Sequence, residues 1–135
     1  MKPFYILSLF GLTALLIAAV LSANEHFSVK EYDEFHDVLH PLEHEALPKG
    51  DFARIRSQSS ALLSRGETLV KLGVPEGTKE SHEAEFEKEL KKFSGALEKF
   101  RADAKDGTDD SLKTSFSAVH DSFEMLAAML PRKSR

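Results

Sequence analysis

Apolar side chains recur every three or four positions along four separate stretches of this chain. Such spacing places them on one face of an α-helix, because a turn takes about 3.6 residues. No stretch alternates polar and apolar residues with the period of two that is typical of a half-buried strand. The pattern predicts amphipathic helices over residues 29–47, 52–71, 78–105 and 111–130. The third series is the most regular, with Phe86, Leu90, Phe93, Leu97, Phe100 and Ala104.

The polar residues between these series match the signals at which helices start and stop. Ser28 and Glu31 have the spacing of a capping box for the first helix, and Asp51 is placed to cap the second. Pro41 lies inside the first helix and lacks a backbone donor, so we expect a kink or a restart next to His40. Four helices with short connections predict an all-α fold, an antiparallel up-down-up-down four-helix bundle.

The first 23 residues follow a different pattern. Lys2 gives a positive start, an almost uninterrupted apolar run follows, and the small residues Ser22 and Ala23 precede polar sequence. This layout is typical of a secretory signal peptide. We therefore expect residues 1–23 to be a signal peptide and residues 24–135 to form the bundle domain, periplasmic or secreted and without membrane contact after cleavage. An uncleaved membrane anchor is the alternative, because the apolar run approaches the length of a bilayer span.

Composition narrows the classes of function. The formal net charge is −4 at pH 7, which argues against nucleic acid as a partner. The chain has no cysteine, which excludes disulfides, thiolate metal ligands and covalent c-type haem attachment. A bound metal ion would therefore have to be held by imidazole and carboxylate groups.

Three of the six histidines follow one another at intervals of four in the first predicted helix: His36, His40 and His44. Imidazoles four residues apart on a helix can reach the same ion. His36 and His44 are separated by about 12 Å of helix rise, so a bend at Pro41 would be needed for all three to share one ion. Among the neighbouring acids, Glu43 falls on the side of His36 and is the expected carboxylate ligand.

His120, in the fourth predicted helix, is the other candidate ligand. Counted from the end that the first and fourth helices share, His36 and His120 both lie about 15 Å along their helices. We therefore predict a metal site between these two helices. Nitrogen and oxygen ligands suit copper, zinc or nickel, and we expect copper or zinc. The predicted ligands are His36, His40, His44, His120 and Glu43.

The segment 116–124, FSAVHDSFE, resembles the C-terminal haem-attachment segment of cytochromes c′, Cys-x-x-Cys-His-x-x-Phe-Arg. His120 and Phe123 match the axial histidine and the aromatic residue, whereas Phe116 and Val119 occupy the two cysteine positions. The likeness covers nine residues and the four-helix layout. It implies a haem-less relative of the cytochrome c′ and cytochrome b562 bundle class, in which only His120 carries over as a ligand.

These observations predict an exported, non-enzymatic metal-binding bundle. Such a bundle could also form a homodimer. One alternative is non-covalent b-type haem, held by His120 with His36 or His40. Another is a structural or interaction bundle with no cofactor. The sequence shows no Gly-x-Ser-x-Gly nucleophile motif, and no inward-facing acid is evident in the second and third predicted helices, as a di-iron carboxylate bundle would require. In the alternative with b-type haem, Phe35, Phe116 and Phe123 would line the slot that holds the haem.

Overall fold

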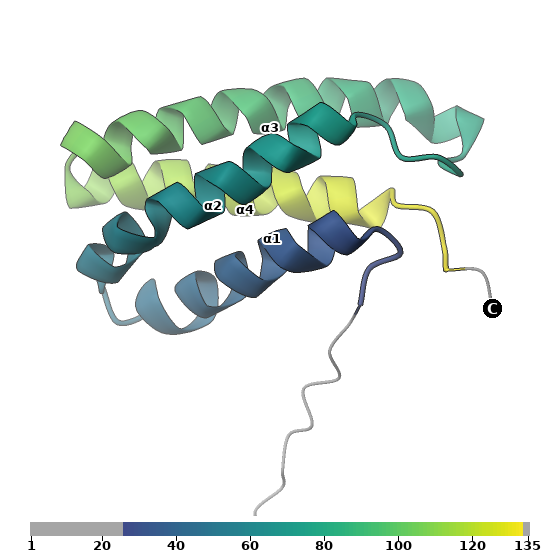
Figure 1. The fold of residues 1–135 in the computed structure, drawn as a ribbon. Coiled ribbons are helices and arrows are strands. Elements are labelled where there is room, and N and C mark those ends of the chain that lie inside the picture. Colours follow the sequence, from purple (N-terminus) through teal and green to yellow (C-terminus); the bar gives the residue numbers. More distant parts are fainter. Residues whose placement is uncertain (1–25, 134–135) are drawn as a thin grey trace, which may run out of the picture.

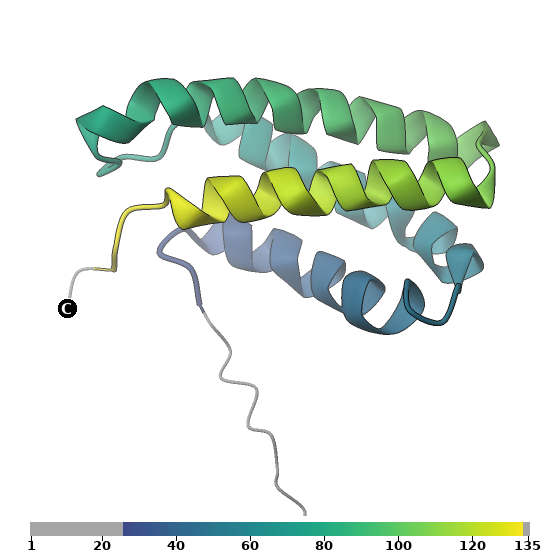
Figure 2. The ribbon, with the colours of Figure 1, turned by 180° about the vertical axis from the view of Figure 1, so that it is seen from behind.

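The computed structural model describes residues 26–133, and this part of the chain is all-helical, with no strand. Successive helices run in opposite directions, and α1 lies beside α4 as well as α2 (Figure 1, Figure 2). The predicted all-α four-helix bundle is thereby confirmed. The elements in chain order are α1 (Lys30–Pro41), the short π-helix η1 (Leu42–Ala46), α2 (Phe52–Leu72), α3 (Glu80–Asp106) and α4 (Asp109–Ala128).

The expected signal peptide or anchor, residues 1–23, lies outside the described residues. From residue 26 to residue 133, no helix is both long enough and apolar enough to cross a membrane.

The side-chain cap expected at the start of α2 is present. The prediction that Ser28 caps α1 is wrong. Asp51 accepts a hydrogen bond from the backbone N–H of Arg54 at 3.1 Å, as a capping side chain should. At α1 the N-cap residue is Val29, and no side chain caps it. Asp33 instead reaches out of the first turn and accepts a hydrogen bond from the backbone N–H of Phe27 at 2.6 Å, which fixes the entry of the chain.

Pro41 ends the α-helical hydrogen bonding of α1, as expected. Its nitrogen carries no hydrogen, so it cannot donate to the carbonyl of Asp37 four residues earlier. The chain continues directly as η1, and Leu47 donates its N–H to the carbonyl of Leu42, five residues back, at 2.8 Å. The restart at Pro41 is therefore a change to the wider turn of a π-helix.

The apolar faces of all four helices meet in one core. The fully buried aromatic side chains are Tyr32, Phe35, Phe86, Phe93, Phe100, Phe116 and Phe123. α1 meets α4 through large rings: Phe123 lies 4.8 Å from Phe35 and 5.8 Å from Tyr32, measured between ring centroids. These rings set the spacing between the two helices that carry the candidate ligands.

Two acids of α3 are buried, which corrects the expectation that the third predicted helix presents no acid inward. Glu89 accepts a hydrogen bond from the hydroxyl of Ser122 in α4 at 2.8 Å. The hydroxyl of Ser115, also in α4, and the ammonium of Lys99 lower the pKa of Asp103. Each of these two acids directly precedes a residue of the apolar series of α3, and the packing of α4 covers both. Their contacts with serines of α4 link α3 to α4.

Gly66 lets α2 approach its neighbours closely. A Cβ atom there would lie 2.7 Å from Cδ2 of Leu97 and 3.3 Å from Cε2 of Phe35. We expect Gly66→Ala to lower the free energy of unfolding by up to about 2 kcal/mol, because overpacking costs about 1–3 kcal/mol and the better helix propensity of alanine returns about 1 kcal/mol.

Gly95 of α3 is the matched control, because a Cβ atom there would meet nothing within 4 Å. Gly95→Ala should raise the free energy of unfolding by about 0.5–1 kcal/mol. Urea unfolding followed by circular dichroism would measure both variants. Equal stabilisation by the two substitutions would contradict the close approach at Gly66.

Candidate metal site between α1 and α4

The two flanks of α1 and η1 face different helices. Glu34 and Glu45, on one flank, form ion pairs with arginines of α2, each at 2.9 Å. His36, on the other flank, lies against α4, where its ring stacks on Phe123 with centroids 6.2 Å apart and planes inclined by 26°. The histidine flank is therefore the one between α1 and α4.

The rings of the three successive histidines lie close together in pairs. The ring centroids of His36 and His40 are 5.1 Å apart, and those of His40 and His44 are 4.3 Å apart. Imidazole nitrogens bind zinc at about 2.0–2.1 Å, so two rings that share an ion have centroids roughly 5 Å apart. Each neighbouring pair thus has about the spacing that two ligands of one ion require.

The surroundings of His36 favour its neutral form. The rings of Phe27, in a T-shaped contact, and of Phe123, in a stacked contact, leave it partly buried. Burial is the main cause that lowers the pKa of His36, and the neighbouring imidazole of His40 lowers it further, while the carboxylate of Glu124 acts in the opposite direction. A neutral imidazole is the form that coordinates a metal ion.

His120 is partly buried on α4 and lies between two carboxylates. Its Nδ1 is 3.1 Å from Oδ1 of Asp121, a hydrogen-bond distance. Its Nε2 is 3.7 Å from Oε1 of Glu124, which is too long for a hydrogen bond. Both ring nitrogens are thus directed at acids of the same helix.

Glu43 carries a carboxylate oxygen that is not satisfied. Its Oε2 is buried and has no hydrogen-bond partner among the described residues. A buried carboxylate oxygen without a donor raises the free energy of the folded state, and a bound cation would offset that cost. Glu43 follows His36 by seven residues, two helical turns, and so shares its side of the helix. The unsatisfied carboxylate oxygen of Glu43 is therefore suited to bind a cation.

Of the predicted ligands on α1 and η1, His36 is the one whose ring lies on a residue of α4, Phe123, and the surface where α1 meets α4 around it is called the groove below. In residues 26–133, no three histidine, aspartate or glutamate side chains are gathered closely enough to hold an ion. His40 and His44 are exposed, so their side chains are free to change rotamer, whereas His36 and His120 are held by their neighbours. Binding by more than two of these residues requires the exposed side chains to turn.

Two polar residues of this groove were missed in the sequence analysis. The count along the helices placed His36 level with His120, and in the structure the ring of His36 stacks on Phe123, three residues after His120. The carboxylate of Glu124 acts against the lowering of the pKa of His36. The signal in the sequence was the spacing of four between His120 and Glu124, with Asp121 directly after the histidine.

The phenylalanines expected to line a haem slot are packed against other rings. Phe35 and Phe123 are fully buried with ring centroids 4.8 Å apart, and Phe116 lies 5.9 Å from Phe100. The rings of Phe35 and Phe123 fill the space between α1 and α4, and the ring of Phe116 packs against α3, so side chains occupy the slot that a flat porphyrin would need. This packing favours an ion at the groove over haem in the core.

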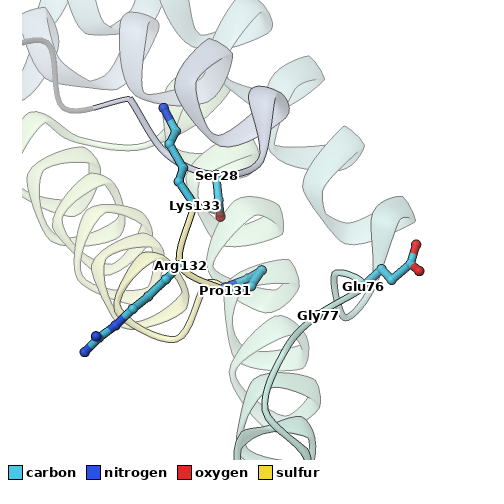
Figure 3. Close-up of a pocket in the computed structure, with 6 residues that line it drawn as sticks. All are labelled: Ser28, Glu76, Gly77, Pro131, Arg132 and Lys133. Carbon is cyan, nitrogen blue, oxygen red and sulfur yellow. The ribbon is translucent and has the colours of Figure 1, made fainter. Parts of the chain in front are cut away.

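A depression elsewhere on the surface offers no comparable group of ligands. It lies at the end of the bundle where α1 begins and α4 ends (Figure 3). Its charged side chains, Glu76, Arg132 and Lys133, extend away from one another (Figure 3). The remaining lining residues are Ser28, Gly77 and Pro131.

Comparison of the chain with protein-family models, with curated proteins and with solved structures gave no match. The resemblance of the segment around His120 to cytochromes c′ therefore stays a prediction.

Proposed function

We propose that this protein is an exported, non-enzymatic metal-binding bundle that holds a copper or zinc ion in the groove between α1 and α4. The ligands are drawn from His36, His40, His44, His120 and Glu43. The observation that carries the proposal is the spacing of the imidazole rings, 5.1 Å from His36 to His40 and 4.3 Å from His40 to His44.

The chemistry of the groove supports a borderline transition metal. Imidazole nitrogens suit copper, zinc and nickel, and the general affinity order of divalent ions favours copper. The unsatisfied Oε2 of Glu43 adds a negative charge on the same flank. A hard cation such as calcium would instead require six to eight oxygen ligands.

The direct test is metal binding by the protein purified without a polyhistidine tag. Elemental analysis and titration with Cu(II) and Zn(II) should show stoichiometric binding. At a free-ion concentration about 100 times the dissociation constant, the ion should add about 2.7 kcal/mol of stability, which raises the melting temperature by roughly 10 °C in a domain of this size.

The control is His82→Ala, which removes a histidine from α3 and should leave both measurements unchanged. If neither ion binds or shifts the melt, the proposal is wrong and the histidines belong to a purely structural bundle.

Metal affinity should fall steeply from pH 7 to pH 5. Protons compete for each imidazole, so affinity should drop about tenfold per pH unit for every coordinating histidine below its pKa. Titration by calorimetry at three or four pH values would measure the slope. Affinity that does not change over this range would show that carboxylates hold the ion.

The ion-free protein should also lose stability as the pH falls from 7 to 5. The folded-state pKa of His36 is lowered, so the unfolded chain binds a proton more readily. The contribution of His36 to stability is therefore complete above its unfolded pKa of about 6.5 and is lost as the pH falls through its lowered folded pKa. Urea unfolding of the ion-free protein measures this loss, and His36→Ala should reduce the pH dependence.

A further inference from the structure

His40 and His44 form an exposed pair of imidazoles where α1 passes into η1. Their ring centroids are 4.3 Å apart and both residues are exposed, whereas His36 is partly buried against Phe27 and Phe123. Two rings on one ion have centroids roughly 5 Å apart, because each nitrogen lies about 2.0–2.1 Å from the metal. Since exposed side chains can change rotamer, the pair needs only a small adjustment to bind one ion.

This pair supplies only two of the ligands that a zinc ion takes. Structural zinc sites are almost always four-coordinate and tetrahedral. In the described part of the chain, no three histidine, aspartate or glutamate side chains are gathered closely enough to hold an ion. An ion on the exposed side of His40 and His44 therefore keeps two positions open to ligands from another molecule.

A second copy of the chain offers the missing ligands. In a dimer with two-fold symmetry the same surface of both copies meets, so an ion on the axis is bound by one histidine pair from each copy. The neighbours of the pair at helical spacing are Asp37, three residues before His40, and Pro41, three residues before His44. Neither has a long side chain that would hold a second copy away.

The charge of this surface makes the ion necessary for the contact. From Glu31 to Pro48 the chain has six acids and no lysine or arginine. Glu34 and Glu45 are paired with arginines of α2, but Asp37 is exposed beside His40. A two-fold contact brings the acids of both copies together, and like charges repel. A divalent cation offsets this repulsion, so the copies associate with the ion and separate without it.

We propose that His40 and His44 bind a zinc ion together with the same pair of a second copy, so that zinc joins two chains into a dimer. The ion between the copies is bound in addition to the ion in the groove. The inference rests on the proposed function, since it uses two of its histidine ligands, and it adds a partner to it. Because dimerisation depends on protein concentration, the chain is a monomer in dilute solution.

The test is the mass of the protein in solution, measured by sedimentation velocity at several protein concentrations with and without Zn(II). The ion-free protein should be a monomer, zinc should double its mass at the higher concentrations, and a chelator should reverse the change. Magnesium, which prefers oxygen ligands, should leave the monomer unchanged. Equal dimerisation with magnesium, or without any ion, would overturn the inference.

His44→Ala removes one ligand from each copy and should stay monomeric in the presence of zinc. His82→Ala, in α3, is the matched control, and His120→Ala removes a candidate ligand of the groove; both should dimerise as the unchanged protein does. Thermal melting without metal shows that each variant is folded. If His44→Ala dimerises with zinc as well as His82→Ala, another surface joins the copies and the inference is wrong.

Zinc content distinguishes one shared ion from separate ions. At saturating zinc and high protein concentration, the unchanged protein should hold one more ion for every two chains than His44→Ala does. One more ion for every single chain would show that each copy binds its own ion, and it would overturn the shared site.

The outcomes separate this inference from the proposed function. If the unchanged protein binds zinc but stays a monomer at every concentration, the inference is overturned while the metal-binding function stands. If the unchanged protein binds no zinc, both fail together.

Discussion

Phe93→Ala should lower the free energy of unfolding by about 3–5 kcal/mol, because it removes a fully buried ring and leaves a cavity. Phe93 lies in the middle of the most regular apolar series, and its ring lies 5.5 Å from that of Phe35 in α1. The substitution therefore weakens the contact between α1 and α3 as well as the packing of α3 itself. Equilibrium unfolding in urea, followed by circular dichroism, measures the change.

Leu72→Ala is the control for this prediction. Leu72 closes α2 with 44% of its surface exposed, so its truncation should change stability by no more than about 0.5 kcal/mol. A loss below about 1 kcal/mol for Phe93→Ala would show that the apolar series of α3 does not form the core. It would contradict the bundle on which the groove depends.

The helices could be predicted because the apolar side chains that become buried recur every three or four residues along the sequence. The residues at three-and-four spacing in α3, from Phe86 to Phe100, are all buried in the structure. The details at the helix ends depend on competition between neighbours and could not be read in the same way. Ser28 and Asp33 were both available near the start of α1, and the hydrogen bond between Asp33 and Phe27 is the one that forms.

Contacts between distant parts of the chain account for the other differences. The burial of Glu89 depends on a serine 33 positions later, which no local pattern of α3 reveals. Pro41 predicted an interruption but not its form, which is the wider turn of η1, closed by the hydrogen bond from Leu47 to Leu42.

The candidate site could be predicted in part for the same reasons. Spacing along one helix correctly places the rings of His36, His40 and His44 beside one another. The relative shift of α1 and α4 could not be read from a count along each helix, because it is set by the packing of rings such as Phe123 against Tyr32, Phe35 and His36.

The second large effect is expected for a pair of substitutions, one on each side of the groove. His36→Ala and His120→Ala should each lower metal affinity by one to several factors of ten, and the double variant should be little weaker than either single variant. Such non-additivity is expected for residues that share one partner, whereas independent sites give additive changes. Titration with Zn(II) and Cu(II) completes the double-mutant cycle.

The metal-induced rise in melting temperature should follow the same pattern. Each variant is compared with its own ion-free form, because His36 packs on Phe27 and Phe123 and its loss alone can lower the melting temperature. His82→Ala on α3 again serves as the control and should keep the full shift.

If His120→Ala keeps both the affinity and the shift, the ion does not bridge the two helices. The pair with ring centroids 4.3 Å apart, His40 and His44, would then be the site to test. His44→Ala would separate these cases. It should abolish binding if the ion lies at the turn into η1, and it should have a small effect if the ion lies between His36 and His120, because His44 is two helical turns from His36.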